Sequence, residues 1–171
     1  MSAAISADGL YRYDLQRVVS DAPGVLAFIM LNPSTADAEK DDPTIRRCIG
    51  FTRRFGYGTL RVVNLFPLRA TDPGELLIHP APEGHENCDY LRAARVDSAL
   101  CIAAWGAHPA VKRLSENARF WLGSIPPAPE LMALGLTNGG HPRHPLYLRR
   151  DAALVPFPAI VARSAEKGEG A

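Results

Sequence analysis

The sequence predicts an α/β fold, a three-layer sandwich with a mainly parallel central sheet and helices on both of its faces. Apolar runs typical of buried strands recur along the chain, at residues 25–31, 60–66, 99–105 and 131–134. Segments with helical spacing and helix-start signals separate these runs. Such alternation is typical of a sheet whose strands run parallel.

The length and composition of the chain indicate one globular domain. Its 171 residues are enough for a full hydrophobic core, and 47% hydrophobic and 22% charged residues are ordinary for a folded protein. We expect a single domain over residues 10–160, with flexible tails at 1–9 and 161–171.

Charge and apolar content exclude several classes of function. The formal net charge of +1 gives no global basic field, so any contact with nucleic acid must use a local basic surface. No apolar run reaches membrane-spanning length and residues 1–9 do not have the pattern of a secretory signal, so we expect a cytoplasmic protein without a membrane partner. The three cysteines show no metal-site spacing, and we expect reduced thiols, no metal and no cofactor.

The segment before the first apolar run predicts one more strand. Residues 11–19 combine aromatic and β-branched side chains with partial alternation, and we expect them to form a strand at an edge of the sheet. The turn residues 20–24 lead from it into the central strand 25–31.

The polar stretch 31–37, Leu-Asn-Pro-Ser-Thr-Ala-Asp, ends the central strand at Asn32. Asp42 followed by Pro43 is a typical helix start. Open α/β sheets bind ligands where a buried strand ends in a polar turn before a helix, so the polar side chains of this stretch are candidate ligand contacts. The alternative is an ordinary turn whose Asn and Ser side chains bond their own backbone.

The helix predicted over residues 43–55 has two distinct faces. Its apolar face carries five residues at helical spacing: Ile45, Cys48, Ile49, Thr52 and Phe55. Its opposite face carries four arginines: Arg46, Arg47, Arg53 and Arg54. We interpret the arginines as a solvated helix surface; the alternative is a stripe that contacts phosphate groups.

The second strand, 60–66, also ends in a polar break, at Asn64. Residues 71–73, Thr-Asp-Pro, predict the start of a short helix, and Asn87 is expected to cap a longer one that runs to about Arg95.

The third strand ends at Trp105, and a proline soon after it predicts another helix. The buried face of that helix is expected to carry Val111, Leu114, Ala118 and Trp121. The proline-rich residues 125–129 can form only a connector, and the fourth strand, 131–134, leads into a polar loop over 137–145. Because the carboxyl ends of parallel strands lie along one edge, we expect Asn32, Asn64, Trp105 and His141 to meet in one pocket.

Two motifs give the chain a specific resemblance to a family of bacterial and phage domains of unknown function. These motifs are Leu-Asn-Pro-Ser-Thr-Ala-Asp at 31–37 and Asp-Asp-Pro-Thr-Ile-Arg-Arg at 41–47. The resemblance extends over roughly residues 10–157. Membership of that family implies no particular activity.

The order of the motifs is also similar, more distantly, to that of the uracil-DNA glycosylase superfamily. In the mismatch-specific branch the first loop reads Gly-x-Asn-Pro-Gly and its Asn positions the attacking water, and Asn32-Pro33 resembles that pair. The last loop of the superfamily reads His-Pro-Ser, which His141-Pro142 matches in part. This chain lacks the first-loop glycines and the cysteines of the iron–sulfur branches, and it has Arg143 where a small residue is usual.

The resemblance implies a pocket for a nucleobase, a nucleotide or DNA, with hydrolysis of an N-glycosidic bond as the candidate reaction. That reaction builds positive charge on the sugar and negative charge on the leaving base, so it needs a group that orients water and a donor near the base. Asn32 is the candidate for orienting water, Asp37 or Asp42 for the general base, and His141 for the donor to the leaving base.

Ligand contacts are expected from six further residues. Asn64 can read a base edge with its paired donor and acceptor, and an aromatic ring can stack on a base. The arginines can hold phosphate groups. These residues are Ser34, Asn64, Phe66, Arg69, Trp105 and Arg143.

Three hypotheses of function remain open from the sequence. The chain can be an enzyme acting on an N-glycosidic bond, a module that binds nucleobases or nucleic acid without catalysis, or a protein-interaction domain. The missing first-loop glycines favour the second hypothesis over a fully active repair enzyme. The polar residues at successive strand ends argue against the third.

Overall fold

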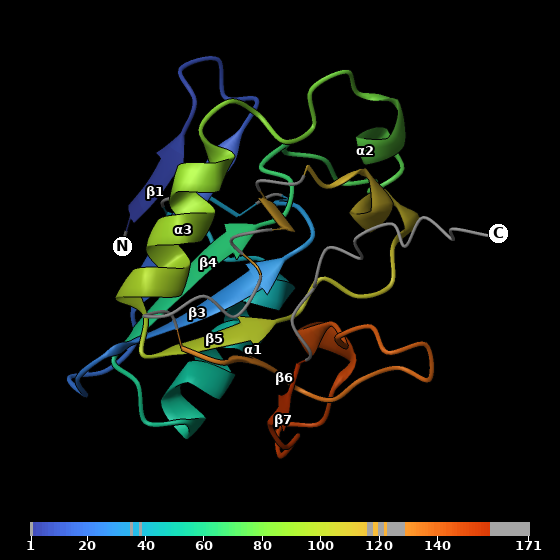
Figure 1. The fold of residues 1–171 in the computed structure, drawn as a ribbon. Helices are drawn as coiled ribbons and strands as arrows, with labels where there is room; N and C mark the ends of the chain where they lie inside the picture. The colour runs from blue at the N-terminus through green and yellow to red at the C-terminus, as the bar shows by residue number, and fades with distance from the viewer. Residues whose placement is uncertain are drawn as a thin grey trace, which may run out of the picture.

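In the computed structural model, residues 2–34, 36–37, 39–115, 118–119, 122 and 129–157 are described. They form a seven-stranded sheet in the order β1-β2-β4-β3-β5-β6-β7, with helices packed against it (Figure 1). The strands are β1 (Ser2–Ile5), β2 (Arg12–Val18), β3 (Val25–Met30), β4 (Thr59–Asn64), β5 (Leu100–Ala103), β6 (Leu131–Ala133) and β7 (Val155–Pro156). The helices are α1 (Pro43–Arg54), α2 (Glu75–Ile78) and α3 (Asn87–Asp97), with 3-10 helices η1 (Pro109–Arg113) and η2 (Pro145–Tyr147).

The four apolar runs of the sequence form the parallel centre of the sheet. β3 pairs in parallel with β4 on one side and with β5 on the other, and β5 pairs in parallel with β6. The pairings of β1 with β2, β2 with β4 and β6 with β7 are antiparallel. The prediction of a mainly parallel sheet is therefore wrong for the flanks, where hairpin-like and returning segments add strands in the opposite direction.

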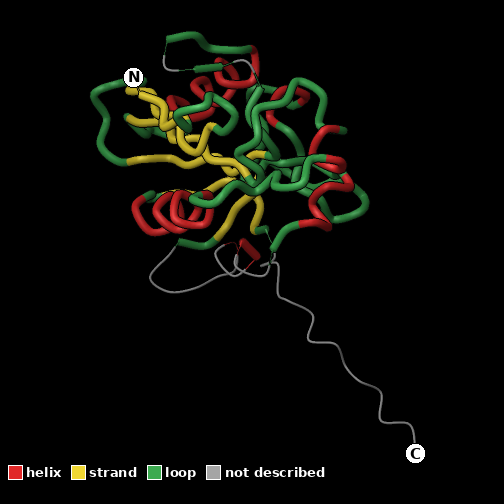
Figure 2. The backbone as a smooth tube through the Cα atoms, turned by 90° about the horizontal axis from the view of Figure 1, so that it is seen from above, coloured by secondary structure: helices red, strands yellow, loops and turns green. Residues whose placement is uncertain are grey.

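Helices cover both faces of the sheet (Figure 2). On one face, Ile45, Cys48 and Phe51 of α1 join a core with the side chains of Leu26 and Phe28. On the other face, α3 packs through Leu91 and Ala94 against a second core that includes Ile29 and Val63. The alternation of neighbouring β3 residues between the two cores follows from the two-residue period of a strand.

Helix α1 begins as the sequence predicts. The Asp42 side chain accepts a hydrogen bond from the Ile45 amide at 2.8 Å, and Pro43 occupies the first turn, where its missing N–H leaves no bond unmade. At its other end, Gly56 has a φ of 80°, a conformation that glycine adopts without strain. These two signals place the helix immediately after the polar loop that follows β3.

Strand β2, which corresponds to the predicted strand 11–19, lies inside the sheet and not at an edge as predicted. β2 lies between β1 and β4, because Ser2–Ile5, within the segment expected to be a tail, forms β1 and pairs with it. The buried side chains of Arg12 and Arg17 on β2 are consistent with an interior position, since both are only 2% exposed.

Several elements expected in the carboxyl-terminal third fall wholly or partly outside the described residues. In the region of the helix expected after Trp105, Pro109–Arg113 forms the 3-10 helix η1 and the described residues 118–119 and 122 are α-helical. Trp121 and residues 125–128 of the predicted connector lie outside the described residues. The expected tail at 161–171 also lies outside them. No helix in the described part of the chain has the length and apolarity needed to cross a membrane.

Candidate functional site

A small polar pocket lies at the carboxyl ends of β3 and β4. Its volume is about 160 Å³. Its polar lining comes from five segments of the chain: Arg12 of β2, Asn32 and Ser34 of the loop after β3, Asp42 and Thr44 at the start of α1, Asn64 and Thr71 at and after the end of β4, and His144 of the last loop. We call it the strand-end pocket.

The parallel pairing of β3 with β4 brings the first two polar breaks together. Met30 lies opposite Asn64 in the register of the two strands. Beyond the strands the two loops stay joined, because the Leu65 amide donates to the Met30 carbonyl at 2.8 Å and the Phe66 amide to the Leu31 carbonyl at 2.9 Å. The predicted meeting of Asn32 and Asn64 in one pocket follows from this pairing.

Asn64 is the most unusual side chain in the pocket. It is 1% exposed, yet neither its Oδ1 nor its Nδ2 has a hydrogen-bond partner among the described residues. A buried amide without partners costs about 1–3 kcal/mol. Because Asn64 also lines the pocket, its amide is a donor and an acceptor available to a ligand.

Asn32 is held in one orientation by backbone carbonyls. Its Nδ2 donates to the Ala70 carbonyl at 2.8 Å and to the Pro33 carbonyl at 3.1 Å. Both amide hydrogens are therefore used, so Oδ1 is the atom of this side chain that remains for a ligand or a water molecule.

Arg12 places a buried positive charge in the pocket. It is not among the site residues predicted from the sequence. Its Nη1 donates to the Ala36 carbonyl at 2.7 Å, and its Nε has no partner in the described part of the chain. Burial lowers the pKa of Arg12 to about 10, an effect that the nearby charge of Asp42 opposes. The guanidinium stays charged at neutral pH and has a donor available.

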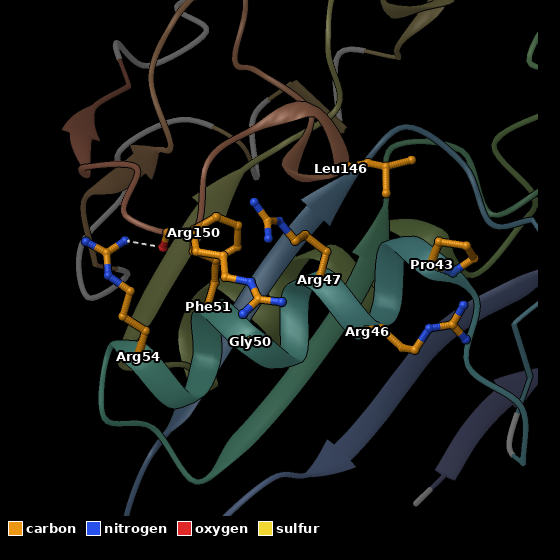
Figure 3. Close-up of a pocket in the computed structure, with 8 residues that line it drawn as sticks. All are labelled: Pro43, Arg46, Arg47, Gly50, Phe51, Arg54, Leu146 and Arg150. Atoms are coloured by element: carbon orange, nitrogen blue, oxygen red, sulfur yellow. Dashed lines mark hydrogen bonds between the residues drawn. The ribbon is translucent and has the colours of Figure 1, made fainter.

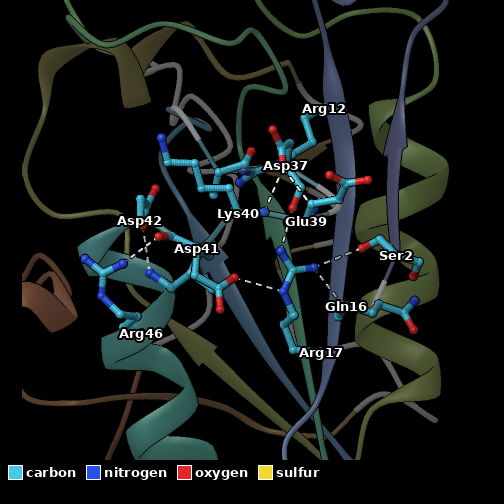
Figure 4. A network of polar contacts seen from close by, with 12 residues as sticks. Ser2, Arg12, Gln16, Arg17, Asp37, Glu39, Lys40, Asp41, Asp42 and Arg46 are labelled. Carbon is cyan, nitrogen blue, oxygen red and sulfur yellow. Dashed lines mark hydrogen bonds and ion pairs between the residues drawn. The ribbon is translucent and has the colours of Figure 1, made fainter.

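A second buried arginine fixes the loop that carries Asn32 and Ser34 (Figure 4). Arg17 forms an ion pair with Asp41 at 2.9 Å and donates to the Asp37 carbonyl at 2.5 Å. Arg12 and Arg17 thus both hold the segment between β3 and α1, and β2 acts as its support. The signal in the sequence was two arginines inside a strand otherwise rich in aromatic and apolar residues.

His144 is the histidine that lines the pocket. Its Nδ1 accepts a hydrogen bond from the Leu146 amide at 3.3 Å, so the proton of the neutral ring lies on Nε2. Burial lowers the pKa of His144, against an opposing contribution from Asp42. His144 is therefore a neutral N–H donor at physiological pH.

His141, the histidine chosen from the sequence, is exposed and does not line the pocket. Its backbone closes a turn with Thr137, whose amide donates to the His141 carbonyl at 2.8 Å. Arg143 is exposed as well, and its Nε donates to the Leu136 carbonyl. Two His-Pro pairs stand three residues apart, and the sequence alone gave no reason to prefer the second.

Asp37 also lies away from the pocket lining. Its Oδ1 accepts from the amides of Glu39 and Lys40 at 2.9 and 2.8 Å, and these bonds lower the pKa of Asp37. A carboxylate stabilised in this way is a weaker general base. Of the two candidate bases in the sequence, Asp42 is the one that lines the pocket, although its Oδ1 caps α1.

The two aromatic candidates belong to the core. Phe66 is fully buried, and Trp105 packs edge-to-face on Phe157 with ring centroids 5.2 Å apart. Both contribute to the cluster on the α3 face of the sheet and not to the pocket lining. Arg69 donates to the Gly9 carbonyl at 3.1 Å and lies beside the pocket residue Ala70.

Metal and thiol chemistry receive no support from the described residues. No group of three or more histidine, cysteine or acidic side chains that could hold a metal ion occurs among them. Burial raises the pKa of both Cys48 and Cys101, which keeps these thiols protonated and poorly nucleophilic.

The fold and the pocket define a mixed α/β protein with a small polar pocket at the carboxyl ends of its parallel strands. Within this class, the chain belongs to the family described as "Protein of unknown function (DUF1643)", whose family model matches residues 12–146. This match agrees with the resemblance to a domain-of-unknown-function family. No curated protein and no solved structure matches the chain.

Proposed function

We propose that the strand-end pocket binds a single pyrimidine ring of the uracil type. The observation that carries the proposal is Asn64, whose buried amide has no partner among the described residues and lines the pocket. An asparagine amide forms paired hydrogen bonds with a base edge that offers one donor and one acceptor.

The size of the pocket limits the ligand to one ring. A volume of about 160 Å³ corresponds to roughly five water molecules, since each takes about 30 Å³ in the liquid. Pockets for larger organic ligands hold about 300–1,000 Å³. A dinucleotide or a base pair is too large for the strand-end pocket.

The donors around Asn64 favour a ring with carbonyl groups. Arg12 and His144 line the same pocket, and each has an N–H that is available to an acceptor. Together with Asn64 they suit an edge that alternates acceptor, donor and acceptor. Uracil and thymine present that edge through two carbonyl oxygens and the N–H between them, whereas cytosine and adenine present amino groups.

The same residues support hydrolysis of an N-glycosidic bond as the reaction. Arg12 and the neutral His144 can stabilise negative charge on a leaving base, and the Oδ1 of Asn32 can orient a water molecule. With His144-Pro145 in place of His141-Pro142, the loop order still resembles the uracil-DNA glycosylase superfamily.

A binding module without catalysis is the second candidate function. The observation that favours it is the engagement of Asp42, whose Oδ1 accepts the Ile45 amide as a helix cap. A general base must be able to approach the proton that it removes. In a carboxylate that caps a helix, one of the two oxygens already accepts a hydrogen bond, so only the other is free to act as a base.

Calorimetric titration of the purified protein with uracil, thymine, cytosine and adenine tests the proposal. We expect uracil and thymine to bind, Asn64→Leu to abolish binding, and Asn138→Ala, a change in the exposed turn, to leave it intact. If none of the four bases binds, the proposed function is wrong. Strand breakage by alkali, after incubation with a uracil-containing oligonucleotide, separates the enzyme from the binding module.

A further inference from the structure

A second, larger depression runs along α1 beside the last loop. It has a volume of about 700 Å³ and is lined by Arg46, Arg47 and Arg54 of the helix and by Leu146 and Arg150 of the facing segment (Figure 3). The lining also includes Pro43, Gly50 and Phe51. We call it the arginine groove.

Within the described residues, the groove arginines bond backbone carbonyls and form no ion pair. Arg46 donates to the Asp41 carbonyl at 2.6 Å, and Arg47 donates to the carbonyls of Pro145 and Leu148. Carbonyl oxygens fix the direction of a guanidinium but do not neutralise it.

Arg54, the third groove arginine on α1, also donates to backbone carbonyls. Arg54 donates to the carbonyls of Arg150 and Ala152, at 3.0 and 2.6 Å. Among the ion pairs of the described residues, none includes one of the four groove arginines. The groove therefore gathers four arginines on a protein whose net charge is +1, and the carboxylate near Arg54 is that of Asp151, which pairs with Arg149.

We propose that the arginine groove binds the phosphodiester backbone of an unpaired nucleic-acid strand. Guanidinium groups are the preferred protein partners of phosphate, because their planar fork donates two parallel hydrogen bonds. Arg47 and Arg54 are two helical turns apart, which corresponds to about 11 Å at about 1.5 Å per residue. Successive phosphates of a stacked strand are about 3.4 Å apart along its axis, so this length spans about three intervals and about four phosphates.

The place of the groove in the fold favours an unpaired strand. The first turn of α1 separates groove from pocket: Pro43 lines the groove, whereas Asp42 and Thr44 line the strand-end pocket. In the last loop, Leu146 borders the groove and His144 the pocket. A strand in the groove can place one of its bases in the pocket only if that base is outside a helical stack. This part of the inference rests on the proposed function.

Gly50 leaves the middle of the groove open. A Cβ atom added at this position would meet nothing within 4 Å, so no packing contact requires glycine here. Glycine in the interior of a helix reduces its stability, and its usual benefit is the close approach of another backbone. An approaching strand backbone would have that room along α1.

A pair of charge-matched double variants tests the groove. Arg46→Gln with Arg150→Gln removes two lining arginines; Arg53→Gln with Arg149→Gln removes two exposed arginines of the same segments that do not line it. The measurement is fluorescence anisotropy of a labelled single-stranded oligonucleotide, in DNA and RNA versions, at 50 to 200 mM salt.

The expected difference is large. Four contacts on a single strand give a salt slope of about −2.8 and two give about −1.4, at about 0.7 per contact. Affinity should therefore fall about 50-fold over this salt range for wild type and for the Arg53/Arg149 control, but only about sevenfold for the Arg46/Arg150 variant. Equal slopes for both double variants would overturn the proposal, as would equally tight competition by heparin or by anionic phospholipid vesicles at equal charge.

Uracil titration keeps this test separate from that of the pocket. The Arg46/Arg150 variant should bind uracil as the wild type does, while Asn64→Leu should keep the salt slope of strand binding even where its affinity for the strand is lower. If uracil fails to bind but the two double variants differ as expected, the groove assignment is supported and the pocket assignment is wrong.

Discussion

The side-chain amide of Asn87 on α3 donates to the backbone carbonyl of Asn64, at 3.0 Å, and to that of Leu65, at 2.9 Å. Asn87 therefore fixes the backbone at the end of β4, while the side chain of Asn64 itself has no partner among the described residues. Two buried asparagines thus differ in the same corner of the fold: Asn87 holds the strand end, and Asn64 lines the strand-end pocket.

Leucine at these two positions should have opposite effects on stability. Asn64→Leu removes an unpartnered buried amide, and we expect it to raise the free energy of unfolding by about 1 kcal/mol. Asn87→Leu leaves two buried carbonyls without their donor and should lower it by about 1–3 kcal/mol. Urea unfolding measures both. A clear loss of stability in Asn64→Leu would show that its amide has a structural partner.

Asn32→Asp should destabilise the protein more than Asn32→Ala. Aspartate places a carboxylate oxygen where Nδ2 now donates to the Ala70 carbonyl at 2.8 Å, so two hydrogen bonds become repulsive contacts. We expect a loss of about 1–3 kcal/mol at pH 7. The loss should shrink below about pH 4, where the new carboxyl is protonated and can donate again. Equal stability of Asn32→Asp and wild type would contradict this view of Asn32.

The stability of the wild type should rise with pH around the titration of His144. Burial lowers the pKa of His144 below its ordinary 6.5, so between its folded pKa and 6.5 the unfolded chain binds more protons. The stabilising contribution is present above pH 6.5 and is lost as the pH falls towards the folded pKa. Thermal unfolding over the range of about pH 5 to 8 should show that the Tm of His144→Gln depends less on pH than the Tm of the wild type. His141→Gln, its exposed counterpart, should keep the wild-type profile.

Gly50→Ala should stabilise α1 and weaken strand binding. Alanine in a helix interior is favoured over glycine by about 0.5–1 kcal/mol, and the added methyl group meets no neighbour. The same methyl group occupies the arginine groove. A rise in Tm together with a several-fold loss of oligonucleotide affinity is the expected result, whereas a fall in Tm would point to a packing constraint on Gly50.

The sequence predicted the centre of the fold because local signals there agree with tertiary structure. The apolar runs became β3 to β6, and Asp42-Pro43 starts α1 as capping chemistry requires. The edges were harder to predict. Residues 2–5 have no strong local preference for a strand, and they form β1 because they pair with β2.

Side-chain direction decided which candidate site residues reach the pocket. Asn32, Ser34 and Asn64 stand at or just beyond strand ends and line it. Phe66 stands only two residues beyond β4, yet its ring enters the core on the other side. A polar break in the sequence marks a strand end, but it does not show on which side of the sheet the next side chains lie.

Strand β7 forms one border of the sheet, and its chemistry gives this border little capacity to pair with a strand of another chain. β7 has two residues, and Pro156 has no amide hydrogen with which to extend a ladder. Exposed sheet borders are the usual templates for edge-to-edge aggregation, and short proline-containing strands are a common protection against it. Among the described residues, the β7 border of the sheet therefore offers few backbone groups for the addition of a further strand.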